Sequence, residues 1–166
     1  MNLDELNSLA AAAAIGEFLR CCGSGRWATA MTAARPFQTF DDVLSTADAI
    51  WTALDQPDWL EAFEAHPKIG ETGTAGWSTR EQAGVAAATT DVRDRLAAAN
   101  RKYEARFGYI FIVCATGKSA YEVLDLLHDR LHNDTDTELR AAADEQRKIT
   151  RLRLAKLLAP ERLPTT

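Results

Sequence analysis

The chain has 166 residues, 46% hydrophobic and 26% charged, and these proportions exclude a disordered chain and are typical of a globular protein. At this length we expect one domain with one core, covering residues 1–166. The net charge of -5 argues against a general nucleic-acid binder, because phosphate contacts need clustered Lys and Arg. An anionic small molecule needs only one or two local positive groups and stays compatible with this charge.

Residues 1–6 carry two acidic residues where a signal peptide has basic residues followed by an apolar stretch. No run of apolar residues is long enough to span a bilayer. The 3 cysteines include an adjacent pair and form no spaced disulfide framework, which is typical of reduced thiols in a reducing compartment. We therefore expect a cytoplasmic protein that does not associate with membranes.

Apolar residues recur at i, i+3 and i+4 through most of the chain, which predicts helices, and clusters of alanine favour helix further. In chain order, we expect helices at 9–19, 26–34, 41–54, 57–63, 78–107, 120–131 and 135–158. The helix at 78–107 is expected to bend near Thr89 and Thr90. Thr135 and Glu138 have the spacing of a capping box at the start of the last helix. The sequence predicts an all-α, single-domain bundle of about seven to nine helices.

One segment departs from the helical pattern. Tyr109 to Ala115 is β-branched and aromatic, a composition that normally indicates a buried strand. A single strand cannot make a sheet, and the chain offers no second strong candidate. We therefore expect an apolar segment deep in the core.

The pair His66-Pro67 is the first candidate for chemistry. The histidine follows a predicted helix, the proline fixes the next φ angle, and a glycine-containing loop follows. The unperturbed pKa of histidine lies near neutral pH, which suits proton transfer. The alternative is a histidine whose charge interacts with a helix C-terminus. Spacing alone leaves both interpretations open and favours the second.

The segment Ser78-Thr79-Arg80-Glu81-Gln82 is the second candidate. Ser78 and Glu81 have the S-x-x-E spacing of a capping box, which explains both residues without a ligand. In the functional interpretation, the free N–H groups of a helix start bind an anion or a carbonyl.

Two further patterns suggest a phosphate-binding loop and a zinc site, but simpler interpretations explain them. Gly117-Lys118-Ser119 suggests a phosphate loop, but that motif needs a glycine at position 112, which is Ile112. His128 and His132 have a zinc-binding spacing, but no third ligand lies nearby in the sequence, so we expect a solvated helix face and no metal.

Arg153 is the best candidate to bind a carboxylate. It follows Ile149 by four residues and therefore lies near the apolar stripe of the last helix. An arginine in such a place is costly unless it is paired.

The order and spacing of these motifs resemble the OHCU (2-oxo-4-hydroxy-4-carboxy-5-ureidoimidazoline) decarboxylase family from about Leu9 to Leu158. The segments that carry the resemblance are Cys21-Cys22-Gly23-Ser24, Arg26-Trp27-Ala28, Arg35-Pro36-Phe37, Trp59-Leu60-Glu61-Ala62-Phe63, His66-Pro67-Lys68-Ile69-Gly70, Ser78-Thr79-Arg80-Glu81-Gln82, residues 103–108, Phe111-Ile112-Val113-Cys114-Ala115 and Lys148-Ile149-Thr150-Arg151-Leu152-Arg153-Leu154.

The resemblance implies an all-helical homodimer without a metal or an organic cofactor. It implies decarboxylation of a ureidoimidazoline to (S)-allantoin as the last step from urate. His66 matches the family's catalytic histidine, and we expect Glu81 to assist it. The resemblance implies substrate contacts from Pro67, Ser78, Thr79, Arg80, Glu81, Gln82, Phe111, Ile112, Val113, Cys114, Ala115 and Arg153.

Two rival functions stay open at this point. A non-enzymatic helical module would explain the amphipathic helices but not a cluster of His66, Glu81 and Arg153. Another cofactor-free enzyme acting on a purine-derived ureide would share the pocket but release no CO2.

Overall fold

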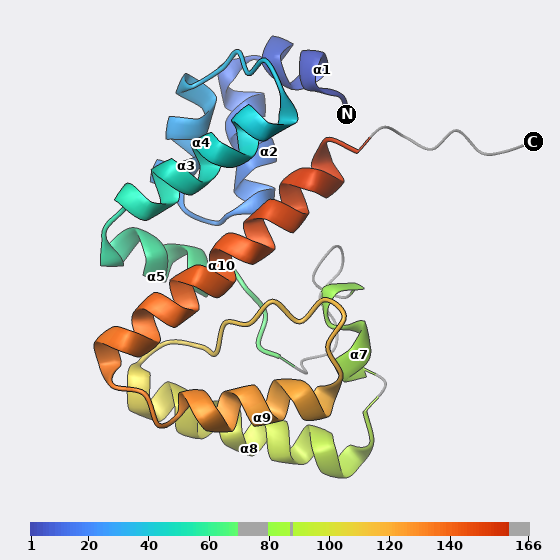
Figure 1. The fold of residues 1–166 in the computed structure, drawn as a ribbon, viewed down its shortest axis with the longest axis vertical. Helices are drawn as coiled ribbons and strands as arrows, with labels where there is room; N and C mark the ends of the chain where they lie inside the picture. The colour runs from blue at the N-terminus through green and yellow to red at the C-terminus, as the bar shows by residue number, and fades with distance from the viewer. Residues whose placement is uncertain (70–79, 87, 160–166) are drawn as a thin grey trace, which may run out of the picture. The chain divides into compact units, whose positions relative to one another are not determined.

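The computed structural model describes residues 1–69, 80–86 and 88–159, and over these ranges it contains nine helices and no strand (Figure 1). The all-α expectation is therefore confirmed. The chain divides into two compact units, one made of Met1–Glu61 with Arg147–Thr166 and the other of Ala62–Gln146. The expectation of a single domain stays a prediction, since two compact units can belong to one cooperative fold.

The first unit contains four whole helices, the beginning of a fifth and the end of the last one: α1 (Leu3–Ser8), α2 (Ala11–Cys21), α3 (Gly25–Ala33), α4 (Phe40–Ala53), α5 (Gln56–Glu64) and α10 (Thr135–Leu157). The sequence analysis missed α1, which is only 6 residues long. Its signal is a capping box, in which the Asn2 side chain accepts from Glu5 N and the Glu5 carboxylate accepts from Asn2 N, both at 2.8 Å.

Aromatic packing organises the core of this unit. Phe18 of α2 lies edge-on to Trp27 of α3 and to Phe37, with ring centroids 5.9 and 6.5 Å apart. Such edge-to-face pairs contribute about 0.5–1.5 kcal/mol beyond the area they bury. The Trp27 indole N–H donates to the Ala47 carbonyl of α4 over 3.1 Å, so this buried polar atom is satisfied and joins α3 to α4.

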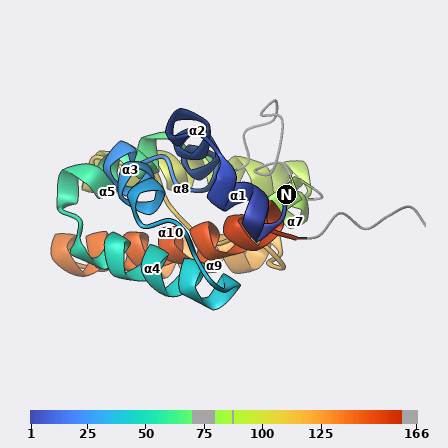
Figure 2. The same cartoon turned by 90° about the horizontal axis from the view of Figure 1, so that it is seen from above.

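The second unit contains α7 (Ala83–Ala86), α8 (Thr90–Phe107) and α9 (Ala120–Arg130), with the end of α5 and the beginning of α10. Helices α8 and α9 pack side by side (Figures 1 and 2) and share a core that includes Tyr103 and Leu124. The expected bend near Thr89 is a break, because Thr89 has an extended backbone with ψ 159°. Helix α8 ends at Phe107 and is capped by Gly108, whose φ of 80° favours glycine.

The segment 109–115 forms neither helix nor strand, and most of its second half is buried: Phe111, Ile112, Val113 and Ala115. This confirms the expected apolar segment in the core. A buried backbone without secondary structure still needs hydrogen-bond partners. Side chains supply two of them: Arg130 donates to the Ile112 carbonyl at 2.6 Å, and Glu145 accepts from Cys114 N at 2.7 Å.

Glu138 is fully buried and forms a polar network within the second unit. Its carboxylate accepts from Arg130 Nε at 2.9 Å, from Asn133 Nδ2 at 2.8 Å and from the Tyr103 hydroxyl. Burial and the bond to Glu138 raise the pKa of Tyr103.

The expected capping box of Thr135 with Glu138 is wrong, because the Glu138 carboxylate points to this network. Asp134 caps α10 instead, with Oδ1 accepting from Thr137 N at 2.8 Å.

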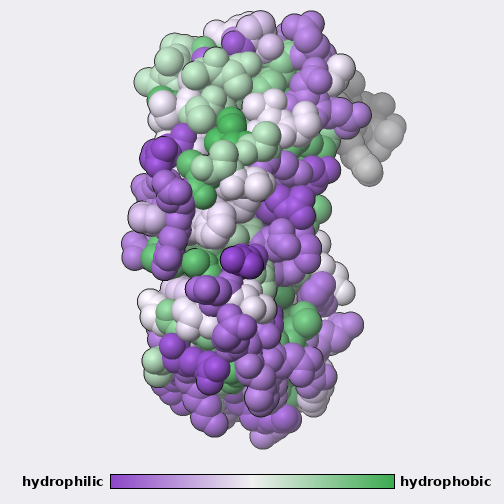
Figure 3. All heavy atoms as spheres, turned by 60° about the vertical axis from the view of Figure 1, so that its left-hand side comes forward, coloured by the Kyte–Doolittle hydropathy of each residue, from purple (hydrophilic) through white to green (hydrophobic). Residues whose placement is uncertain are grey.

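Within the described ranges, no helix is long and apolar enough to cross a membrane. Hydrophilic residues cover much of the lower part of the face in Figure 3, where α8 and α9 lie in Figure 1. The exposed large apolar side chains are Leu19, Phe40, Tyr121 and Leu152.

Replacing Glu138 by alanine is expected to lower the free energy of unfolding by about 3–5 kcal/mol, because it leaves the largely buried Arg130 guanidinium without its carboxylate. Urea denaturation measures this difference. Glu17→Ala is the matched control. It breaks a solvent-exposed ion pair with Arg20 at 2.6 Å and should lower the free energy of unfolding by less than about 1 kcal/mol. Equal losses in the two variants would contradict the central role of Glu138.

Candidate functional site around His66

His66 lies just beyond the end of α5, where its backbone N–H donates to the Phe63 carbonyl at 3.1 Å. The side chain is half-buried, and its Nε2 lies 2.6 Å from Oε1 of Gln146. Gln146 belongs to α10 and is fully buried. His66 is therefore a helix-end residue, as the simpler interpretation held, but its ring is also fixed by a buried amide. A half-exposed imidazole with one nitrogen fixed is suited to directed proton transfer.

The residues after His66 and Pro67 are fastened to α8. Lys68 pairs with Glu104 at 2.9 Å, and Asn100 Nδ2 donates to the Ile69 carbonyl at 3.3 Å. Lys68 and Ile69 border a cavity of about 310 Å³ in the second unit. A separate cavity of about 380 Å³ lies in the first unit. The residues that line the smaller cavity are Lys68, Ile69, Arg93, Ala97, Asn100, Arg101 and Glu104.

Only part of the segment 78–82 can be placed. Ser78 and Thr79 lie outside the described residues, so the proposed capping box with Glu81 stays a prediction. Arg80 is exposed, while Glu81 and Gln82 are half-buried. The charge of Glu81 is one of the causes that raise the pKa of Cys114, which brings Glu81 near the 111–115 segment.

A glycine explains how closely α7 approaches the backbone just before α9. A Cβ atom on Gly84 would stand 2.1 Å from the Lys118 carbonyl oxygen, closer than any side chain tolerates. The backbone of α7 at Gly84 therefore packs directly on the backbone at Lys118, which leaves no room for a side chain.

Cys114 is the half-buried member of the 111–115 segment, whose other side chains are buried in the core. Burial, more than the nearby Glu145 charge, raises the pKa of its thiol. Its backbone N–H donates to Glu145 at 2.7 Å, so this N–H already has a partner within the chain. The substrate contacts expected from this segment stay predictions.

Arg153 belongs to the first unit and is buried, with 8% of its surface exposed. Its positive charge lowers the pKa values of Cys21 and Cys22, although burial outweighs it and raises them to about 12 and about 11. Its burial agrees with the expected place near the apolar stripe of α10, and carboxylate binding by Arg153 stays a prediction. His66 and Glu81 lie in the other unit, and one site with all three residues stays a prediction.

The sequence analysis missed Gln146 and Glu145. The available signal was register: Gln146 stands four residues after Ala142 and three before Ile149, which places a polar side chain on the buried stripe of α10. A polar residue at such a position needs a partner, but the sequence alone does not say which one.

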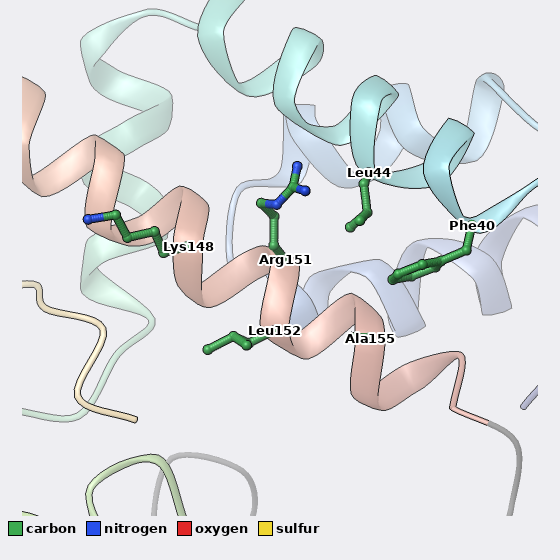
Figure 4. Close-up of a pocket in the computed structure, with 6 residues that line it drawn as sticks. All are labelled: Phe40, Leu44, Lys148, Arg151, Leu152 and Ala155. Atoms are coloured by element: carbon green, nitrogen blue, oxygen red, sulfur yellow. The ribbon is translucent and has the colours of Figure 1, made fainter. Parts of the chain in front are cut away.

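The cavity of about 380 Å³ in the first unit is lined by none of the expected site residues. It is an apolar groove where Phe40 and Leu44 of α4 face α10 (Figure 4). Its remaining lining residues come from α10: Lys148, Arg151, Leu152 and Ala155. Arg151 pairs with Asp48 of α4 at 2.7 Å, so the rim of the groove is partly neutralised.

Within the described ranges, no group of three or more His, Cys, Asp or Glu side chains could hold a metal ion. His132 Nδ1 instead donates to the His128 carbonyl at 2.8 Å, and both side chains are exposed. These two residues form the solvated helix face that the sequence analysis favoured.

The fold and site define a helical protein in which a histidine after a helix is held by a buried glutamine. The family model of OHCU decarboxylase matches residues 7–155, and the chain belongs to that family. A mouse (Mus musculus) 2-oxo-4-hydroxy-4-carboxy-5-ureidoimidazoline decarboxylase is 34% identical over 138 residues, which cover 79% of this chain and 78% of that protein.

A solved structure and a plant relative extend this similarity. A crystal structure of OHCU decarboxylase in the presence of (S)-allantoin is 40% identical, with a TM-score of 0.80, and the match covers 87% of this chain and 98% of that one. The uric acid degradation bifunctional protein TTL of Arabidopsis thaliana is 38% identical over 151 residues, which cover 86% of this chain. The chain spans only 47% of the length of that protein.

Proposed function

We propose that this chain decarboxylates 2-oxo-4-hydroxy-4-carboxy-5-ureidoimidazoline to (S)-allantoin in uric acid degradation. The observation that carries the proposal is the match to the structure of an OHCU decarboxylase in the presence of (S)-allantoin, which extends over 98% of that chain. The half-buried His66 ring, fixed by Gln146 at 2.6 Å, supplies a group suited to the chemistry.

The reaction breaks the bond between the ring carbon and its carboxylate, and CO2 leaves without the bonding electron pair. The neighbouring C=O and C=N groups of the substrate absorb that pair, so we propose that neither a metal nor an organic cofactor takes part. The protein's task is orientation and charge placement. His66 then delivers a proton from one face to the adjacent ring carbon, which bears the ureido group, and this yields one allantoin enantiomer. The hydroxyl-bearing carbon becomes the C=O of allantoin as its hydroxyl proton moves to the ring nitrogen, and a proton from water restores the imidazole.

Glu81 and Arg153 have supporting roles in this proposal. The Glu81 carboxylate stabilises the positive charge of a protonated His66, and the Arg153 guanidinium binds the substrate carboxylate or its ureido edge. The burial of Arg153 and the half-buried position of Glu81 support these roles. Further contacts are proposed from Pro67 and from the segments 78–82 and 111–115.

His66→Ala is expected to lower the decarboxylation rate about 10²–10⁴-fold, the usual contribution of a positioned acid or base. The substrate is generated fresh from urate with the oxidase and the hydrolase, and optically active allantoin is followed by circular dichroism. EDTA is present throughout and would abolish turnover if a metal took part. His128→Ala removes an exposed histidine and serves as control. Wild-type turnover in His66→Ala would contradict the mechanism, and turnover without CO2 release would indicate another ureide enzyme.

Arg153→Lys is expected to raise KM about tenfold or more, because the planar guanidinium binds a carboxylate through two hydrogen bonds and an ammonium does not. A hydrogen bond to a charged group contributes about 1.5–3 kcal/mol. Arg151→Lys, which alters a neighbouring arginine paired with Asp48, is the control. An unchanged KM in Arg153→Lys, with folding verified by thermal unfolding, would exclude substrate binding by Arg153.

We also propose that the chain forms a homodimer, as the family resemblance implies, and that it is cytoplasmic, as expected from the sequence. Light scattering during size-exclusion chromatography is expected to give twice the mass of one chain at micromolar concentration. A particle with the mass of one chain would contradict the dimer. Cell fractionation tests the location.

A further inference from the structure

The contact between His66 and Gln146 asks for an explanation because Gln146 is fully buried. An amide buried without hydrogen bonds destabilises the fold, and apolar residues such as Ala142 and Ile149 occupy the same stripe of α10. An apolar residue there would avoid that cost. The distance of 2.6 Å between Gln146 Oε1 and His66 Nε2 shows that the amide forms a hydrogen bond with the imidazole.

The chemistry of the two groups sets the position of a proton. A carbonyl oxygen only accepts hydrogen bonds, so the Nε2 atom that faces Gln146 Oε1 must donate. His66 then keeps its Nε2 proton in both charge states, and the neutral ring is the Nε2–H tautomer. Nδ1 is the nitrogen that gains and loses a proton.

The backbone limits the ring from the other side. His66 N donates to the Phe63 carbonyl at 3.1 Å, and Pro67 restricts the backbone at the next residue. A side chain fixed at its backbone and at Nε2 has little freedom to turn about its χ angles. The Nδ1 atom therefore points in one direction before the substrate reacts, so no conformational entropy of the ring is lost in reaching the transition state.

We propose that Gln146 is a positioning residue for the decarboxylation: it orients the His66 ring and holds it as the Nε2–H tautomer, so that Nδ1 delivers the proton to the substrate carbon. This inference rests on the proposed function, because it assigns a task to His66. It adds a residue that acts through the histidine and does not itself touch the substrate.

Nuclear magnetic resonance of the ¹⁵N-labelled imidazole tests the tautomer without substrate. Wild-type protein should show the Nε2–H tautomer when His66 is neutral, and Gln146→Leu should show a mixture. Gln146→Glu keeps an acceptor and adds a charge next to Nε2, so the pKa of His66 should rise by about one unit or more. Ile149→Val, a buried truncation on the same helix, should leave the tautomer unchanged.

Kinetics separates positioning from a structural role. Gln146→Leu is expected to lower kcat about 10–100-fold with a smaller change in KM, the range seen when a histidine at a metal site loses its orienting partner. Gln146→Glu should restore part of kcat and shift the pH profile upward, whereas Ile149→Val should keep wild-type kcat. In a His66→Asn background, Gln146→Leu should cause no further loss.

Three results would overturn the inference: a wild-type tautomer ratio in Gln146→Leu, an equal loss of kcat in Ile149→Val, or a further loss on top of His66→Asn. Failure of the proposed function looks different. In that case the wild-type protein would not decarboxylate the ureidoimidazoline, while the ring of His66 would still respond to Gln146→Leu in the magnetic resonance spectra.

Discussion

The buried carboxylate of Glu138 is the constraint on which the second unit depends. A fully buried charge is tolerated only with a paired cation and satisfied oxygens, and Arg130, Asn133 and Tyr103 meet both needs. Arg130 also donates to the Ile112 carbonyl, and its guanidinium lies 4.7 Å from the centre of the Phe111 ring. The same arginine therefore neutralises the carboxylate and holds a core segment that has no secondary structure of its own.

Polar side chains of α9 and α10 supply the hydrogen bonds that a neighbouring strand would give to the backbone of the 109–115 segment. In a sheet, a neighbouring strand satisfies the backbone groups of an apolar strand. Here, Glu145 accepts from Cys114 N and Arg130 donates to Ile112 O. An apolar, β-branched sequence can therefore run through an all-helical core, because its partners are long charged side chains with enough reach.

The helices could be predicted from the sequence because their signal is local. Apolar periodicity placed α2, α4, α9 and α10 within about two residues of their ends, a usual margin. The error at Glu138 has a different origin: its spacing from Thr135 fits a capping box, but Arg130 and Tyr103 compete for the carboxylate. The His-Pro pair was visible, whereas its partner Gln146 stands 80 residues away. A pair so far apart in the chain produces no periodic pattern in the sequence from which it could be predicted.

Two adjacent residues of α10 each contact one of the stretches of the second unit that the site proposal uses. Glu145 holds the backbone at Cys114, and Gln146 holds the ring of His66. Successive side chains of a helix point roughly 100° apart, so neighbours can face different segments. One rigid turn of helix thus fixes the histidine and the 111–115 segment relative to each other. Proton delivery to a single face of a substrate needs such a fixed relation, because a small displacement of the acid would lose both rate and stereochemistry.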